Sequence, residues 1–584
     1  MSLKVKDHMR FHLLLILFLS ISSVYGQNKS LEVLGIESIK FNYPKIISSE
    51  NEAKEIGIEI LQELYEAGYL AASIDSVLSD SNRTSIFFSE NSRYRWVLLR
   101  QGNLSDLEFQ AIDFNSKLFL NRPFNPKQLS RFYKKTINYF EERGYPFASI
   151  QLDSVLIDSN QGISAAIQLT KNEYYSVDSI SIKGNSKINE SFLLSHLDIQ
   201  LNEAYQESDF KNIDIRINEI PFVKQTREKE VQFFEDYVKL IVYLEKKRAS
   251  RFDGVIGLLT NENDGKIEFT GDVDLNLINA FSRGESLGLN WRKLQGNSQD
   301  LKINFAYPYL FNSPIGIEAN FKLYRKDTTF IELYNRLGIN YNLRRGEYVK
   351  LFIENKSSRL LTKDQYVNPL NASLPPFGDV RINLFGVGYQ LNRLDYLYNP
   401  QKGISLYTDF AVGRKKLIKI AALEELQADI YEDIDLTTNQ FNGNLAISYF
   451  IPLGRKSTVL VANKSASTYS ENIYQNELLR IGGLKILRGF DEESITASTY
   501  SIFSLEYRFL LDRNSFFSVF SDGGYYEANT VGDYYNDTPL GIGAGISFET
   551  NAGIFTFNYA VGKQFDNPID LRAAKIHFGF INFF

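Results

Sequence analysis

The chain has 584 residues, and a polypeptide of this length is expected to form two or more domains. It contains no cysteine, which excludes a disulfide framework and attachment to a membrane through a lipid-modified cysteine. The formal net charge is only −6, so the composition indicates no nucleic-acid partner.

The first residues are typical of a secretory signal peptide. Three basic residues open the chain, and the apolar run Phe11–Ile21 follows them. The small residues around Gly26 suit signal peptidase, so we predict a signal peptide over residues 1–26. An uncleaved membrane anchor is the alternative, but the run is shorter than the roughly 18 residues of a membrane helix. No later stretch is apolar for that long, which still allows a β-barrel, because its alternating strands have moderate average hydropathy.

The first half of the chain contains an internal repeat. The string GYLAASIDSVLSDSN (68–82) recurs as GYPFASIQLDSVLIDSN (144–160), about 76 residues later. A second pair is offset from the first: WVLLRQGN (96–103) and DSISIKGN (178–185) are both strand patterns that end on Gly-Asn. Repeats of this period indicate that one structural unit occurs several times.

The sequence before Gly144 shows how one unit is built. Asn125 is a good N-cap, and Pro126 suits the first helical position. Gly144 ends the predicted helix in a left-handed cap. Alternating strands follow on both sides of residue 160. The apolar face of this helix is predicted to consist of Leu129, Phe132, Tyr133, Ile137 and Phe140.

The order of strand, two helices and two strands in about 75 residues resembles the POTRA (polypeptide-transport-associated) domain. The Gly-Asn after the first strand and the Gly-Tyr after the second helix carry this resemblance. We expect three such units, of which the first has the weakest opening strand. The predicted boundaries are 27–94, 95–174 and 175–248.

Residues 249–584 have a different pattern, in which short segments alternate apolar and polar residues between turn signals. At about 21 residues for each strand and turn, this length accommodates about sixteen strands, and single-chain outer-membrane barrels have even numbers. The predicted fold is therefore α+β repeats followed by an all-β, 16-stranded antiparallel transmembrane barrel. A large soluble β-sandwich or propeller is the alternative.

The last strand alternates apolar and polar residues and ends on an aromatic residue. In this it resembles the C-terminal recognition signal of outer-membrane barrels. Gly579 is a candidate kink that would weaken the pairing of this strand with its neighbours. The string GIGAGI (541–546) is not a phosphate-binding loop, because no helix follows it. Its glycines are expected to keep one strand face small so that another segment passes close to it. The aromatic and apolar residues of the last strand are Ile576, Phe578, Phe580 and Phe584.

The chain offers little to an enzyme. After the predicted cleavage only His196 and His577 remain, far apart in the sequence. There is no cysteine nucleophile, no His-Glu-x-x-His and no Gly-x-Ser-x-Gly motif. We therefore predict no enzymatic activity, no cofactor and no metal site.

The string GGLKILRGFDEESI (482–495) resembles a loop motif of the BamA/TamA type of outer-membrane assembly and translocation proteins, the bacterial surface-antigen family. Glu506 in SLEYRF and Asp522 in FSDGG follow in the family's order. The segment 395–406, with its Asn-Pro-x-x-Gly, also looks like a hairpin of that family. The residues that match the motif itself are Gly482, Gly483, Leu487, Arg488, Gly489 and Phe490.

This resemblance implies that the loop folds back into the barrel lumen and that Arg488 pairs with Glu506 and Asp522 on the wall. Such pairing is physically reasonable, because a guanidinium inside a barrel is costly unless carboxylates bind it. Leu487 departs mildly from the family, which usually has a β-branched residue at this position. A surface hairpin with an exposed arginine is the alternative for the bare string.

The resemblance also implies a function that needs no ATP or cofactor. The protein would lie in the outer membrane of a Gram-negative cell, with its POTRA units in the periplasm. Those units would bind unfolded outer-membrane or secreted polypeptides, or a periplasmic partner protein, by strand addition. A weakly paired seam between the first and last barrel strands would open toward the lipid bilayer.

Three POTRA units make the layout closest to TamA. The main alternative is a two-partner secretion transporter that exports one dedicated client. Such transporters usually have two POTRA units and a plug helix, and no clear helix precedes the first unit here. A passive porin or receptor would not need the periplasmic repeats.

Overall fold

The computed structural model describes residues 29–260, 267–293, 298–343, 346–363, 366–367, 374–396, 399–426, 430–550, 553–565 and 567–582. The predicted signal peptide and Phe584 lie outside the described residues. The chain divides into two compact units: one is built mainly from residues up to Asp178, and the other mainly from Lys239 onward. None of the described helices is both long and apolar enough to cross a membrane.

The N-terminal part begins with a four-stranded sheet of order β2-β1-β4-β3, in which β1 and β4 are parallel. Ser49 caps α2 by accepting from the backbone N–H of Glu52, and the helix buries Ile56, Ile60 and Leu64 against the sheet. The elements are β1 (Lys29–Leu34), β2 (Ile46–Ile47), α2 (Glu50–Glu66), β3 (Ser73–Ser79) and β4 (Arg83–Ser89).

A second sheet repeats this topology with the order β6-β5-β8-β7, again with its two central strands parallel. Asn125 accepts from the N–H of Gln128 at 3.1 Å and Pro126 opens α4, as their positions predict. The buried side of α4 consists of Phe132, Thr136 and Phe140. The elements are β5 (Arg95–Arg100), α3 (Asp106–Ala111), η1 (Ser116–Leu118), β6 (Leu120–Pro123), α4 (Pro126–Glu141), β7 (Ser149–Ile157) and β8 (Gly162–Thr170).

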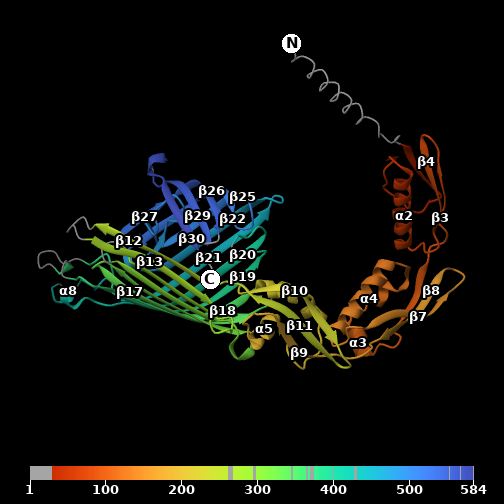
Figure 1. Cartoon of the computed structure of the whole chain (residues 1–584), viewed down its shortest axis with the longest axis horizontal. Coiled ribbons are helices and arrows are strands. Elements are labelled where there is room, and N and C mark those ends of the chain that lie inside the picture. The colour runs from red at the N-terminus through yellow and green to blue at the C-terminus, as the bar shows by residue number, and fades with distance from the viewer. Residues whose placement is uncertain are drawn as a thin grey trace, which may run out of the picture. The chain divides into compact units, whose positions relative to one another are not determined.

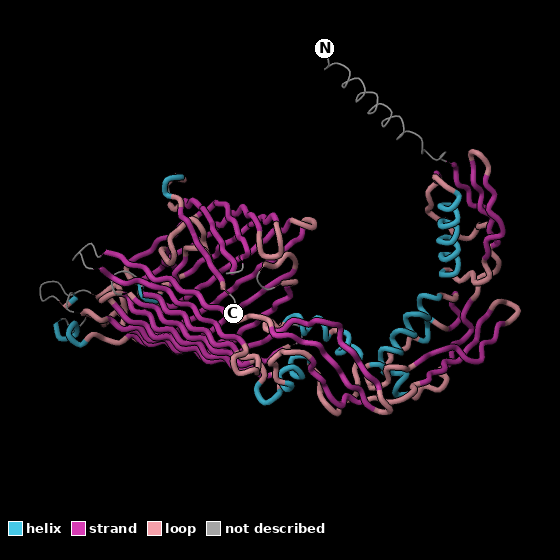
Figure 2. Tube along the Cα trace, viewed as in Figure 1, coloured by secondary structure: helices cyan, strands magenta, loops and turns pink. Residues whose placement is uncertain are grey.

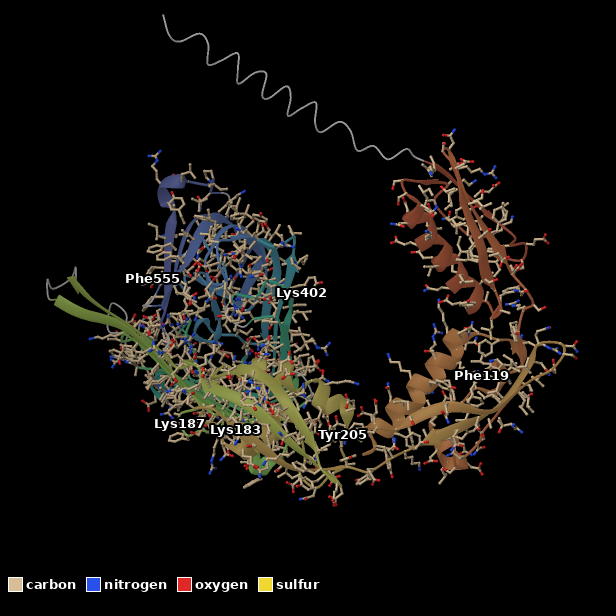
Figure 3. All side chains as sticks on the ribbon, turned by 45° about the vertical axis from the view of Figure 1, so that its right-hand side comes forward. Phe119, Lys183, Lys187, Tyr205, Lys402 and Phe555 are labelled. Carbon is tan, nitrogen blue, oxygen red and sulfur yellow. The ribbon has the colours of Figure 1, made fainter. Side chains whose placement is uncertain are left out.

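Most of the predicted face of α4 packs on the core, and the polar Thr136 joins it. Leu129, Tyr133 and Ile137 are only partly buried, whereas the polar Thr136 is fully buried. Thr136 can be buried because its hydroxyl donates to the carbonyl of Phe132 at 2.9 Å. The core around the helix contains Trp96 and Phe119, whose rings meet edge to face. Figure 3 labels Phe119.

A third set of elements forms a sheet of order β10-β11-β9. Gly144 links it to the second sheet: its N–H donates to the carbonyl of Tyr205 at 3.0 Å, and its carbonyl accepts from Tyr175 at 2.8 Å. The elements are β9 (Ser176–Lys183), α5 (Glu190–Leu197), α6 (Glu207–Lys211), α7 (Ile213–Glu219), β10 (Val223–Phe233) and β11 (Tyr237–Lys246).

His196 on α5 contacts the turn before β16. Its Nδ1 lies 3.0 Å from the hydroxyl of Tyr309, and its Nε2 lies 2.9 Å from the carbonyl oxygen of Arg216. A carbonyl only accepts, so Nε2 carries the proton and Nδ1 accepts from the tyrosine. Burial lowers the pKa of His196 to about 4, which keeps this bridging imidazole neutral.

The remainder of the chain forms an antiparallel sheet of seventeen strands (Figures 1 and 2). One of them, β27 (Asp533–Asp537), pairs only with the end of β26, so sixteen strands form the wall and the predicted barrel is confirmed. The wall strands are β12 (Arg251–Thr260), β13 (Ile267–Ile278), β14 (Ser286–Lys293), β15 (Gln299–Tyr307), β16 (Ile315–Lys326), β17 (Phe330–Asn342), β18 (Tyr348–Leu360), β19 (Val380–Leu394), β20 (Gly403–Leu417), β21 (Thr437–Pro452), β22 (Ser457–Ser470), β25 (Thr499–Leu510), β26 (Phe516–Thr530), β28 (Leu540–Thr550), β29 (Gly553–Lys563) and β30 (Lys575–Ile581).

The barrel is nearly closed. Every wall strand pairs with its sequence neighbours in a continuous ladder, but within the described residues no register joins β12 to β30. Strand β18 shows which side faces the lumen, because Lys350 and Glu354 are buried while the alternate residues Leu351 and Ile353 are 65% and 50% exposed. Charged side chains inside and exposed apolar ones outside are the pattern of a barrel in lipid.

Short elements occupy the ends of the barrel. Figure 1 shows α8 at the end of the barrel strands away from α5. The long connection between β22 and β25 contains a two-stranded ribbon, β23 paired with β24. These elements are α8 (Ala421–Leu426), β23 (Leu479–Ile481), β24 (Ile495–Ala497), η3 (Leu310–Asn312), η5 (Gln475–Glu477) and η6 (Leu571–Ala573).

Candidate functional site

The candidate site is the tip of the connection from 471 to 498, which we call the lumenal loop. Ile481 on β23 pairs with Ile495 on β24, and the chain between them forms the tip. Gly482 has a φ of +115°, and a Cβ there would lie 2.3 Å from the carbonyl oxygen of Asp491. The tip is therefore a compact turn that requires glycine at this position.

Arg488 binds the wall carboxylate of Asp522 through three N–H groups. Its backbone N–H, Nε and second terminal nitrogen donate to Asp522 at 3.0, 2.7 and 2.7 Å. The remaining terminal nitrogen donates to Glu506 on β25. The guanidinium carbon also lies 3.5 Å from the ring centroid of Phe520, a cation–π contact. We call this arrangement the arginine clamp.

The clamp is buried, which sets its energetic character. Arg488, Glu506 and Asp522 are 9%, 4% and 1% exposed. In a buried pair of this kind, the hydrogen bonds between the charges offset the free-energy cost of removing them from water. Removing one partner leaves an uncompensated charge and costs about 3–5 kcal/mol. In this structure Arg488 is buried beside the wall and not exposed on a surface hairpin.

Two wall glycines allow the tip to approach closely. A Cβ on Gly541 would lie 1.9 Å from the carbonyl oxygen of Arg488, and one on Gly562 would lie 2.6 Å from that of Gly489. Gly489 itself has a φ of +94°, and its N–H donates to Nε2 of His577 at 3.2 Å. The glycine string at 541–546 therefore has the small strand face that its sequence predicts, and the loop passes over it.

The clamp continues toward the Asn-Pro hairpin. Arg508 donates through Nε to the second oxygen of Glu506 at 2.6 Å and through a terminal nitrogen to Oδ1 of Asn399 at 3.0 Å. Asn399 is 3% exposed and donates to the carbonyl of Arg513 at 3.0 Å. A chain of charge-assisted bonds thus joins two motifs that lie about 90 residues apart in the sequence.

Sequence reasoning missed several members of this site: Arg508, Asn399, Phe520, His577 and Gly562. The Asn-Pro hairpin motif pointed to Asn399 as a conspicuous residue. The contact between Asn399 and Arg508 could not be predicted, because it depends on which strands are neighbours. Leu487 is fully buried and Phe490 is 8% exposed, both in the small core beneath the ribbon.

The base of the lumenal loop is held on another part of the wall. Lys415 on β20 donates to Glu477 at 2.5 Å, and both side chains are at most 2% exposed. Asn476 donates to the hydroxyl of Ser358 at 2.6 Å and to the carbonyl of Gly378 at 2.8 Å. The loop is therefore fixed at its base and at its tip.

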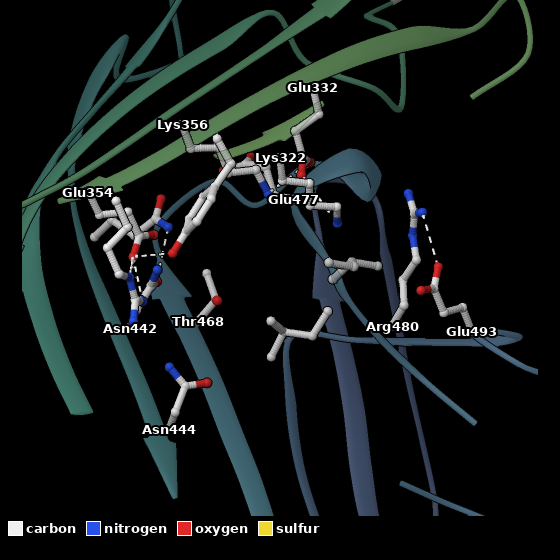
Figure 4. A pocket seen from close by; sticks show the side chains of 15 residues that line it. Lys322, Glu332, Glu354, Lys356, Asn442, Asn444, Thr468, Glu477, Arg480 and Glu493 are labelled. Carbon is white, nitrogen blue, oxygen red and sulfur yellow. Dashed lines mark hydrogen bonds and ion pairs between the residues drawn. The ribbon is translucent and has the colours of Figure 1, made fainter. Parts of the chain in front are cut away.

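A polar cavity of about 330 Å³ lies between the wall and the loop (Figure 4). Figure 4 shows the carboxylate of Glu493 from the loop tip facing the guanidinium of Arg480. Wall residues of both charges line the cavity, among them Lys322, Glu332 and Lys356. Within the described part of the chain, no group of acidic or histidine side chains is arranged to hold a metal ion.

The last strand pairs with β29 from Lys575 to Ile581 in one register, which continues through Gly579 opposite Thr556. Ile576 and Phe578 are 71% and 50% exposed on the outer side, whereas Phe580 is half-buried against Phe555. The structure thus places these residues on the barrel wall, away from the clamp. The weakening effect predicted for Gly579 stays a prediction.

A sixteen-stranded barrel with a charged lumen, an in-folded loop and preceding POTRA-like units defines the class of outer-membrane assembly and translocation barrels. Residues 279–584 match the Omp85 superfamily domain, and the chain belongs to this superfamily. The predicted relationship to the BamA/TamA type of barrel is therefore confirmed, and the fold implies the Gram-negative outer membrane. No curated protein matches the chain.

Two solved CdiB structures share the fold. CdiB from Escherichia coli is 12% identical, with 91% of this chain and 98% of that chain covered and a TM-score of 0.55. CdiB from Acinetobacter baumannii is 14% identical, with 91% and 97% covered and a TM-score of 0.53. BamA from Haemophilus ducreyi lacking POTRA domains 1–3 is 17% identical, with 84% and 100% covered and a TM-score of 0.44.

Proposed function

We propose that this protein inserts, assembles or translocates other polypeptides at the outer membrane, and that it does so through the seam between β12 and β30. The observation that carries the proposal is that the described residues of these two strands form no ladder, in a wall where the other described neighbours are paired over long stretches. Unpaired backbone groups at the two edges can pair with an incoming strand. A client segment could then enter lipid without leaving its own N–H and C=O groups unsatisfied.

The lumenal loop supports this route, because its tip and its base are both bonded to the wall and the folded loop lies across the lumen. The role we assign to Arg488, Glu506 and Asp522 is to hold that loop against the wall. Gly482, Gly483, Leu487, Gly489 and Phe490 shape the tip for this contact.

The N-terminal α/β units are proposed to be three periplasmic POTRA domains over 27–94, 95–174 and 175–248, before a barrel over 249–584. Their sheets have edge strands, such as β3 and β7, that can accept an extended client or a periplasmic partner protein by strand addition. This layout is closest to TamA. We propose no enzymatic step and no cofactor, because strand exchange needs neither.

Dedicated export of one client, as in two-partner secretion, is the second candidate. The fold is shared with CdiB structures as well as with assembly barrels, so it is compatible with both. The two functions differ in what is lost when the protein is removed. General assembly predicts that many barrels leave the outer membrane, whereas dedicated export predicts the loss of one secreted protein.

The test combines depletion with a locked seam. Cells depleted of the protein are complemented with the wild-type protein or with variants that carry one cysteine on β12 and one on β30. The native chain has no cysteine, so each introduced pair can form only the intended disulfide within the chain. We expect oxidation of the seam pair to reduce many barrels in outer-membrane proteomics, and reduction to restore them.

A matched control pair joins strands that are already paired. Leu289 and Ile303 are directly opposite each other on β14 and β15, and a disulfide there should leave client levels unchanged. If a fully locked seam supports normal client levels, the lateral route is wrong. If only one secreted protein is lost, dedicated export replaces general assembly.

A further inference from the structure

Three consecutive acids follow the arginine clamp motif, and the clamp uses none of them. They are Asp491, Glu492 and Glu493. Glu492 stays within the loop, because its carboxylate accepts from the backbone N–H of Leu484 at 3.3 Å. The other two acids reach the barrel wall in different directions.

Glu493 contacts the strands that follow the first edge of the barrel. Its carboxylate accepts from Arg292 on β14 at 2.7 Å, and the same guanidinium nitrogen donates to Asp300 on β15 at 2.8 Å. The side chains of Arg292 and Glu493 are 15% and 29% exposed, and that of Asp300 is 1% exposed. Glu493 has a φ of +57°, an uncommon conformation for a residue with a side chain.

The rest of the tip is attached to strands on the other side of the seam. Arg488 binds β25 and β26, Gly541 on β28 underlies its carbonyl, and the N–H of Gly489 donates to His577 on β30. Asp491 also pairs with Lys575 on β30 at 2.8 Å. That pair is 67% and 39% exposed, so it contributes little by itself.

We propose that the loop tip is a strap across the seam and that Glu493 is its fastening on the side of the first strands. This inference rests on the proposed seam and adds the residues that hold it shut. The strap joins β14 and β15 to β25–β30 through the lumen, so it restrains the seam, where the described residues of β12 and β30 form no ladder. Releasing the Glu493–Arg292 contact frees the first strands while the arginine clamp keeps the loop in place.

The arrangement lets the fastening be removed without collapse of the barrel. When Glu493 loses its charge, Arg292 keeps Asp300 as a partner, so no buried charge is left alone. Replacement by lysine goes further, because the new charge faces both Arg292 and Arg480. The neighbouring Glu492→Lys makes the same charge change on a residue whose carboxylate accepts from the loop backbone and whose charge acts on His577 of β30. It leaves the Glu493–Arg292 contact in place, which makes it the control for a charge change at the tip.

The experiment measures the seam directly in the full chain in lipid nanodiscs without client. Spin labels are attached at Phe252→Cys on β12 and Phe578→Cys on β30, whose native side chains are 51% and 50% exposed. We expect Glu493→Lys to raise the population of longer label-to-label distances about two- to five-fold, the range that one partly exposed ion pair can supply. Glu493→Gln should give a smaller rise, and Glu492→Lys, which keeps the Glu493–Arg292 contact, should give a smaller rise than Glu493→Lys.

Heat-modifiable gel mobility reports whether each variant is folded. Folded Glu493→Lys and Glu493→Gln proteins with the wild-type distance distribution would overturn the strap, as would an equal change in the Glu492→Lys control. Because no client is present, this result is independent of the proposed function. Seam widening by Glu493→Lys, together with normal client levels when the seam is locked by a disulfide, would retain the strap and reject the lateral route instead.

Discussion

Asp522 accepts three N–H groups from a single residue, and this geometry makes the arginine clamp specific for arginine. A planar guanidinium can bind one carboxylate in a bidentate way and still donate to a second one, whereas an ammonium is a point charge. The contact with the ring of Phe520 adds a requirement for a flat cation.

Arg488→Lys is therefore expected to lose much of the clamp although it keeps the charge. Arg488→Ala and Asp522→Asn should each destabilise the folded barrel by about 3–5 kcal/mol, because each leaves a buried charge without its partner. Urea titration of the folded fraction in lipid, followed by gel mobility, measures this. Lys402→Ala, on an exposed turn residue, serves as the control (Figure 3). Wild-type stability in all three clamp variants would show that the contacts contribute nothing.

Asn399 is expected to act on the clamp through Arg508. Asn399→Ala removes the acceptor that orients the Arg508 guanidinium on Glu506, and we expect a loss of about 1.5–3 kcal/mol, typical of a hydrogen bond to a charged group. A double-mutant cycle with Arg508→Lys should give a coupling free energy above about 0.5 kcal/mol. Strict additivity of the two changes would mean that the hairpin and the clamp are independent.

At the scale of elements, the lumenal loop packs closely on strands β28 and β29 because these strands have glycine, with no side chain, at the points of contact. The loop backbone lies where the Cβ atoms of Gly541 and Gly562 would be. A rigid strand cannot move away without breaking its ladder, so any side chain at these positions has to displace the loop.

Gly541→Ala is expected to loosen the loop tip, at a cost of about 1–3 kcal/mol for an overpacked contact. Limited proteolysis within 471–498 should become faster, while the barrel stays folded. Gly443→Ala on β21 is the matched control, because nothing lies within 4 Å of its added Cβ. Equal cleavage rates in the two variants would contradict the close fit.

The contact between α5 and the turn before β16 is expected to depend on pH. Burial holds the pKa of His196 at about 4, below its ordinary value of 6.5, so the unfolded chain binds the proton more readily than the folded one. The stabilisation is complete above pH 6.5 and is lost as the pH falls toward 4. Because residue 196 as a whole keeps some solvent exposure, screening reduces this contribution, and we expect a loss of about 1–2 kcal/mol.

Hydrogen exchange at Tyr309 and in α5, compared between pH 7.5 and pH 5, measures this effect. His196→Gln keeps an acceptor and a donor but does not titrate, so its exchange should be nearly independent of pH over this range after correction for the intrinsic rate. An equal pH response in wild type and variant would assign the effect to another group.

At the scale of the whole molecule, the chain combines repeated α/β units with a barrel whose described strands are all paired with their neighbours except β12 with β30. The confirmed predictions are the fold class and the superfamily. The domain boundaries, the periplasmic location of the first units and the roles of the loop residues stay proposals. The depletion and seam-locking experiments test the proposed function on which the roles of these parts depend.

The sequence by itself determined the local features of this protein. The Asn125-Pro126 start of α4 follows from capping chemistry, and the sixteen strands follow from alternation with period two. The small face at Gly541 was also predictable, because glycines inside a strand pattern indicate a close approach. Each of these rests on interactions between residues a few positions apart.

Only the tertiary structure decided which distant residues meet. The contacts of Arg508 with Asn399, of Gly489 with His577 and of Glu493 with Arg292 join strands from different parts of the barrel. Periodicity says that a residue faces the lumen, but it does not say what lies opposite across the lumen. The path of the lumenal loop settles that, and the path depends on backbone torsions such as the left-handed φ of Glu493, which no local pattern predicts.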